Sequence, residues 1–112
     1  GLPRCINLTS GEIREAMADP LSKIVEAVKR TLERTPPELA ADIVDRGIML
    51  AGGGALVRGI SDLVSHETGI FTHIAEDPLL CVVNGCGEVL DDFKKLRRVV
   101  DTPDFARNAI RD

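Results

Sequence analysis

The chain has 112 residues, of which 44% are hydrophobic and 29% are charged, and its formal net charge is −4. This composition is typical of a globular protein, and no apolar run approaches the ~20 residues that cross a bilayer. The negative charge argues against a general nucleic-acid-binding surface. We expect one domain or a piece of one, excised from a longer protein because it begins at Gly1 without methionine, and we expect no secretion signal.

The first third of the chain predicts a strand followed by a long helix. Residues 4–8 alternate with the two-residue period of a strand, with Ile6 and Leu8 on its buried face. Residues 9–12 have the spacing of a capping box, which predicts that a helix begins there. Pro20 is expected to kink this helix. Its apolar stripe comprises Ile13, Met17, Leu21, Ile24, Val25, Val28 and Leu32.

A second capping pattern predicts a shorter helix. Thr35 is the expected N-cap, and a proline in the first turn is compatible with helix formation because its missing N–H would have no partner there. The helix should run to about Asp45, and Gly47 is the expected stop.

The second half of the chain predicts a β-α-β-α unit. Strands at 48–51 and 71–75 flank a helix that passes through Leu56 and ends at Gly69, and residues 77–78 should cap and open the last helix. Strands connected in this way lie parallel. Because two or three strands make a poor independent sheet, we expect part of a larger α/β fold.

The last predicted helix contains two glycines and a basic cluster. Gly85 and Gly87 each cost about 1 kcal/mol relative to alanine, so we expect close approach of another element to compensate. The cluster of Lys94, Lys95, Arg97 and Arg98 is interpreted as the end of this helix, where cations offset exposed carbonyls. Residues 101–112 are expected to form a flexible tail.

Cysteine and histidine residues show no metal-ligand spacing. Cys5, Cys81 and Cys86 are odd in number and lack a C-x-x-C pattern, and His66 and His73 do not complete one. We therefore predict no metal site, and reduced, partly buried thiols in a cytosolic protein.

Three consecutive glycines, Gly52, Gly53 and Gly54, follow the apolar segment at 48–51. Residues without side chains let a ligand reach main-chain N–H groups, and the N-terminus of a following helix favours an anionic ligand. Nucleotide binding is the first hypothesis. The alternative is a turn that only packs a strand against a helix.

Two common phosphate-binding motifs match incompletely. Gly54 and Gly59 have P-loop spacing, but no lysine follows, so this interpretation fails. Gly52 and Gly54 fit a dinucleotide fingerprint, whose third glycine is replaced by Val57. With Glu76 or Asp77 as the ribose-binding acid, a Rossmann-like dinucleotide-binding enzyme fragment stays an alternative.

A third pattern extends over nearly the whole chain, from Gly1 to about Val99. It resembles the last third of the bacterial MreB family of actin-like ATPases. The segments that carry the resemblance are GLP at 1–3, TSGEIREA at 9–16, IVEAVK at 24–29, LERTPPELAADI at 32–43, GGGAL at 52–56, GI at 69–70 and AEDPL at 75–79, with Val82, Gly85 and Gly87.

The resemblance implies an α/β fold: the C-terminal portion of an actin-like ATPase, in a ribonuclease-H-like subdomain ordered β-α-α-β-α-β-α. Residues 1–100 would be the C-terminal segment of its domain II. It also implies ATP or ADP as the ligand, with Mg in the complete protein. The residues that match the nucleotide-contacting loop are Gly52, Gly53, Gly54, Ala55 and Leu56, and Leu79 and Leu80 would edge the adenine together with Leu56.

The function implied by the resemblance is a filament-forming protein that maintains rod cell shape by organising cell-wall elongation. Its partners would be further copies of itself, a RodZ-type membrane adaptor and the elongation machinery, at the inner face of the cell membrane. Neither nucleic-acid binding nor membrane insertion by this segment is expected. No catalytic residue is assigned, because the phosphate and metal motifs needed for hydrolysis are absent from this sequence. A sugar-kinase-type enzyme fragment and a free-standing module that caps filaments are the alternatives.

Overall fold

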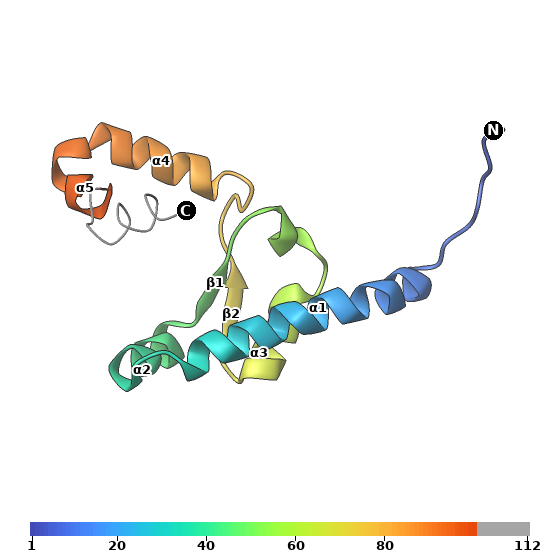
Figure 1. The fold of residues 1–112 in the computed structure, drawn as a ribbon, viewed down its shortest axis with the longest axis horizontal. Coiled ribbons are helices and arrows are strands. Elements are labelled where there is room, and N and C mark those ends of the chain that lie inside the picture. The colour runs from blue at the N-terminus through green and yellow to red at the C-terminus, as the bar shows by residue number, and fades with distance from the viewer. Residues whose placement is uncertain (101–112) are drawn as a thin grey trace, which may run out of the picture. The chain divides into compact units, whose positions relative to one another are not determined.

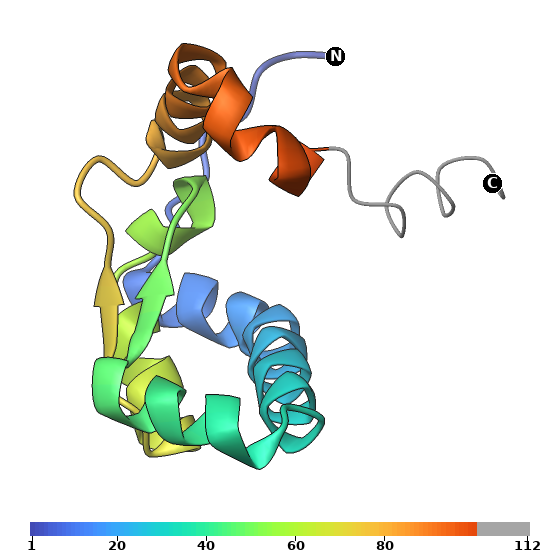
Figure 2. The same cartoon turned by 90° about the vertical axis from the view of Figure 1, so that its left-hand side faces the viewer.

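The computed structural model describes residues 1–100, with side chains to residue 97. The described residues form two compact units: residues 1–48 with 59–73, and residues 49–58 with those from 74 to 100. Strands β1 (Ile48–Leu50) and β2 (Thr72–Ile74) form a two-stranded sheet. The two strands run in parallel, as Figure 2 shows, so the predicted β-α-β connection is confirmed.

The first unit is built on the long helix α1 (Ser10–Glu33), which packs against α3 (Ile60–Thr68) (Figure 1). The Thr9 hydroxyl accepts a hydrogen bond from the Glu12 N–H at 3.2 Å, so the predicted cap is confirmed. Helix α1 continues through Pro20. The core of this unit contains Val25, Ile60 and Val64, and Val64 is only 1% exposed.

The strand predicted at residues 4–8 is wrong. These residues have no regular secondary structure, and Ile6 and Leu8 are exposed. An alternating sequence becomes a strand only where a neighbouring strand accepts its backbone hydrogen bonds. The sheet in the described part of the chain consists of β1 and β2 alone.

Helix α2 (Pro37–Arg46) begins without the predicted Thr35 cap. The Thr35 hydroxyl instead donates to the Thr31 carbonyl at 2.7 Å, because the last turn of α1 leaves carbonyls without helical donors. The predicted stop is confirmed: Gly47 has a φ of 85° and its N–H donates to the Ile43 carbonyl.

The chain after β2 makes a turn before α4 (Cys81–Asp91), so the predicted helix is present but its predicted start at residues 77–78 is wrong. Asp77 has a φ of 47°, and its carbonyl accepts from the Leu80 N–H at 2.9 Å. This positive φ is incompatible with an N-cap in extended conformation. The Cys81 thiol also donates to the Asp77 carbonyl, at 3.5 Å.

The predicted last helix is two helices. Helix α4 ends at Asp91, and α5 (Phe93–Val100) is separate, because Asp92 leaves the helical conformation with φ −120° and ψ 38°. The basic cluster therefore lies on α5 and not at the end of the preceding helix, which corrects its interpretation. Residues 101–112, predicted as a flexible tail, lie outside the described residues.

Helix α4 presents its glycines to open space. A Cβ built on Gly85 or Gly87 meets no described atom within 4 Å, so the expected close approach does not occur within this part of the chain. Val82 and Leu90 are each 73% exposed.

The thiols are free, but Cys5 and Cys86 are exposed and only Cys81 is partly buried, which corrects the expectation for the other two. Among residues 1–100, no helix has the length and apolar character of a membrane span.

Candidate functional site

The glycine loop in the second unit is held by one long-range hydrogen bond. Strand β1 ends at Leu50, and Gly52 follows with a φ of 86°, a conformation that favours glycine. The Gly52 N–H donates to the Pro78 carbonyl at 2.7 Å. The loop is thereby fixed to the segment that follows β2.

The glycines lead into one turn of 3₁₀ helix, η1 (Gly53–Leu56), and not into the longer helix predicted through Leu56. The Ala55 N–H donates to the Gly52 carbonyl at 3.1 Å. Val57 then adopts an extended conformation, and α3 begins only after Gly59, whose φ is 84°. The prediction that a long helix directs its N-terminus at the glycines is wrong, because the chain leaves helical geometry at Val57.

Two N–H groups of this loop have no acceptor in the described part of the chain. Gly53 and Gly54 open the 3₁₀ turn, so no preceding turn accepts from their amides, and no side chain does so either. Both residues are exposed. A Cβ built on Gly54 would meet nothing within 4 Å, so a ligand atom can approach this backbone. The arrangement offers adjacent donors to an anionic or polar group.

Apolar side chains accompany these donors. The Leu79 Cδ2 lies 3.3 Å from the position that a Cβ on Gly53 would occupy, so the structure brings together these two residues of the predicted site. Leu56, Leu79 and Leu80 are 57%, 66% and 50% exposed, whereas Ala55 is 4% exposed and serves to pack the turn. The sequence did not predict that the Pro78 carbonyl accepts a hydrogen bond from the loop, because Pro78 was expected to lie in a helix.

The described residues include no cluster of side chains suited to binding a metal ion. No group of three or more His, Cys, Asp or Glu side chains that could hold a metal ion occurs among the described residues. Glu76 and Asp77, the possible ribose-binding acids of a dinucleotide site, are exposed at the turn before α4. The loop also lacks the helix N-terminus that a dinucleotide fold places directly after its glycines.

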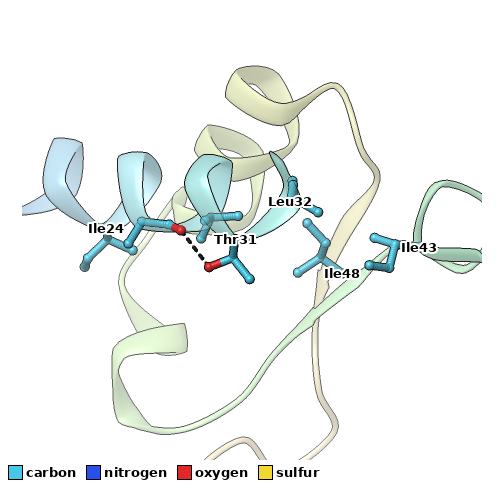
Figure 3. A pocket seen from close by; sticks show the side chains of 8 residues that line it. Ile24, Thr31, Leu32, Ile43 and Ile48 are labelled. Atoms are coloured by element: carbon cyan, nitrogen blue, oxygen red, sulfur yellow. Dashed lines mark hydrogen bonds between the residues drawn. The ribbon is translucent and has the colours of Figure 1, made fainter. Parts of the chain in front are cut away.

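The first unit contains a separate apolar groove of about 540 Å³, bounded by α1, α2 and β1 (Figure 3). Its one polar side chain, Thr31, donates its hydroxyl hydrogen to the Ala27 carbonyl at 2.9 Å. The groove thus lacks the donors that would orient a nucleotide. The residues that line it are Ile24, Ala27, Val28, Thr31, Leu32, Ile43, Gly47 and Ile48.

Comparison with known proteins agrees with the resemblance carried by the sequence motifs. Residues 1–98 match the profile of the MreB/Mbl protein family. The chain is 48% identical over 96 residues to the cell shape-determining protein Mbl of Bacillus subtilis, covering 86% of this chain and 29% of that protein. It is 53% identical over 91 residues to the cell shape-determining protein MreB of Escherichia coli, covering 81% and 26%.

Solved structures give the same assignment. MreB5 of Spiroplasma citri bound to AMPPNP superposes with a TM-score of 0.78 at 42% identity, covering 85% of this chain and 28% of that one. The ADP-bound MreB5 gives 0.76 at 38% identity, covering 91% and 30%. The chain thus spans less than a third of the length of these relatives, and its α/β fold is a part of the actin-like fold. Given the family profile, the sequence identities and the structural agreement, the chain belongs to the MreB/Mbl protein family.

Proposed function

We propose that this chain is the C-terminal segment of an ATP-binding, filament-forming bacterial actin homologue that maintains rod shape by organising cell-wall elongation. The observation that supports this proposal most is that Gly53 and Gly54 are exposed, lie beside exposed leucines, and have N–H groups without an acceptor among the described residues. The solved structures of MreB5 bound to AMPPNP and to ADP also support the proposal. Residues 1–100 would form part of domain II of the longer protein.

The loop would bind the nucleotide through its backbone. The Gly53 and Gly54 N–H groups would donate to oxygens of the ribose and the nearer phosphate, and Gly52 would set the direction of the loop. Leu56, Leu79 and Leu80 would offer apolar surface to the adenine. Phosphoryl transfer also needs a positioned water and Mg²⁺, which residues of the longer protein outside this segment would supply.

Substitution of Gly54 tests the loop with little risk to the fold, because its Cβ position is open. In the complete encoded protein, Gly54→Asp places a carboxylate beside the nucleotide, whereas Gly54→Asn has nearly the same shape without the charge. We expect Gly54→Asp to weaken ADP binding about tenfold or more relative to Gly54→Asn, as measured by calorimetric titration, since 1.4 kcal/mol of repulsion is sufficient. Equal ADP affinities of the two variants would mean that the phosphates do not lie beside Gly54.

The cellular role extends beyond the loop. Self-assembly into filaments, contact with a RodZ-type adaptor and the elongation machinery, and a position at the cytoplasmic face of the membrane follow from the family resemblance. Exposed apolar residues, such as Met49 of β1, support the proposal of such contacts. ATP-dependent sedimentation of the complete protein tests the filament part of this proposal.

A further inference from the structure

The segment between β2 and α4 holds the glycine loop through a turn that departs from the regular pattern of the sheet. The Ala75 N–H donates to the Leu50 carbonyl at 2.9 Å. In a regular parallel ladder, the carbonyl of Ala75 would then accept from the N–H of Gly52, two positions after Leu50. The Gly52 N–H instead donates to the Pro78 carbonyl at 2.7 Å. Residues 76–78 therefore replace the next ladder hydrogen bond by a longer route.

Asp77 sets the direction of this turn through its backbone. Its φ of 47° is the one positive φ of a residue other than glycine in the described part of the chain. Such a conformation is costly for a residue with a side chain and persists only where the surrounding contacts require it. The Asp77 carbonyl accepts from the Leu80 N–H at 2.9 Å and from the Cys81 thiol at 3.5 Å. Its carboxylate is exposed and makes no hydrogen bond or ion pair with the described residues.

The turn makes two contacts with the glycine loop. The Pro78 carbonyl accepts from Gly52, at the start of the loop. The next residue, Leu79, places its Cδ2 3.3 Å from the position that a Cβ on Gly53 would occupy. The N–H groups of Gly53 and Gly54 follow directly after these contacts and have no acceptor among the described residues. The direction in which these N–H groups point therefore depends on the turn.

We propose that Asp77 is a positioning residue for the nucleotide. Its positive φ directs the Pro78 carbonyl and Leu79 onto the glycine loop, which aims the free N–H groups of the loop at the ligand. The identity of the ligand rests on the proposed function, whereas the effect on the loop is a property of the nucleotide-free protein. Asp77 acts through its backbone conformation. A ribose-binding acid of a dinucleotide site would instead act through its carboxylate.

Substitutions of Asp77 in the complete encoded protein separate these two roles. Asp77→Gly adopts a positive φ without strain, and Asp77→Asn keeps the shape of the side chain without its charge. Asp77→Ala and the β-branched Asp77→Val make a positive φ progressively more costly. Calorimetric titration measures the ADP affinity of each variant, and amide hydrogen exchange without ADP measures the protection of the Gly52 N–H. The Gly47 N–H, which donates to the Ile43 carbonyl at the same distance of 2.7 Å, is the reference for a folded protein.

The ADP affinity should follow the cost of the positive φ and not the charge. We expect Asp77→Gly and Asp77→Asn to bind ADP within about twofold of the parent protein, whereas Asp77→Ala and Asp77→Val bind about fivefold and about tenfold more weakly. Exchange of the Gly52 N–H should accelerate by similar factors in Asp77→Ala and Asp77→Val, while exchange of the Gly47 N–H stays unchanged.

Two results would overturn the proposal. A loss of ADP affinity in Asp77→Asn or Asp77→Gly equal to that in Asp77→Val would assign the role to the carboxylate. Unchanged exchange of the Gly52 N–H in Asp77→Val would show that the turn does not hold the loop. If faster exchange of Gly47 shows that Asp77→Val is unfolded, Asp77→Ala decides by the same criteria. If the parent protein does not bind ADP, the proposed function fails, and exchange of the Gly52 N–H still decides whether Asp77 positions the loop.

Discussion

Gly47 is the residue whose backbone most clearly requires glycine. It has a φ of 85°, and a Cβ built there would lie 2.6 Å from the Phe71 carbonyl oxygen, which accepts from the Ile48 N–H. Gly69 also has a positive φ, of 70°, but its Cβ position is open. A comparison of substitutions at Gly47 and Gly69 therefore distinguishes the cost of the left-handed conformation from the cost of a steric clash.

Substituting both positions should give unequal losses of stability. We expect Gly69→Ala to lower the free energy of unfolding by about 1 kcal/mol, from the left-handed conformation alone. Gly47→Ala should cost about 2 kcal/mol or more, because the clash disrupts the start of β1 as well. Urea midpoints of the complete protein measure both, and equal midpoints for the two variants would contradict the clash.

The ion pair between Lys29 on α1 and Glu67 on α3 should respond to pH. The Lys29 ammonium donates to Glu67 Oε2 at 3.1 Å and holds the pKa of Glu67 below its ordinary value of 4.5. Its stabilising effect is therefore present above about pH 4.5 and is lost as the pH falls through the lower folded pKa.

Removal of the ammonium should restore the ordinary titration. In Lys29→Gln we expect the pKa of Glu67 to rise toward 4.5, as followed by NMR titration of its side-chain carboxyl carbon. Lys23→Gln, which removes an exposed lysine that pairs with Asp19, is the control. An unchanged Glu67 pKa in Lys29→Gln would mean that the pair does not form in solution.

At the scale of elements, α1 depends on a local cap. The Thr9 hydroxyl accepts from the Glu12 N–H, whereas Ser10 is exposed and makes no described side-chain hydrogen bond. Thr9→Ala should destabilise the first turns by about 1 kcal/mol, and Ser10→Ala by less than about 0.5 kcal/mol. Amide hydrogen exchange should be about fivefold faster over residues 13–17 in Thr9→Ala only. Equal amide exchange rates in both variants would show that the Thr9 cap does not stabilise the first turns of α1.

Elements with local signals were predictable, and those that depend on distant partners were not. The α1 cap and the Gly47 stop follow from side-chain and backbone chemistry within a few residues. Residues 4–8 have a strand pattern but no partner strand within the part of the chain that the structure describes. The start of α4 was misplaced because the conformation of Asp77 and the Gly52–Pro78 hydrogen bond depend on segments more than twenty residues apart.

For the whole molecule, the sequence indicated the location of the candidate site but not its geometry. The three glycines predicted a backbone that a ligand can reach, and in the described part of the chain the amides of two of them, Gly53 and Gly54, have no acceptor. Whether their amides were already used as donors depended on the 3₁₀ turn, which the sequence did not predict. The proposed role of the chain therefore depends on two N–H groups, at Gly53 and Gly54, that have no acceptor among the described residues.

Amide NMR of the complete, ¹⁵N-labelled protein titrated with ADP tests this claim most directly. We expect the Gly53 and Gly54 amide resonances to shift on nucleotide binding, while those of Gly85 and Gly87 on α4, whose Cβ positions are open like that of Gly54, shift little. Saturable ADP binding that leaves the Gly53 and Gly54 resonances in place would contradict it.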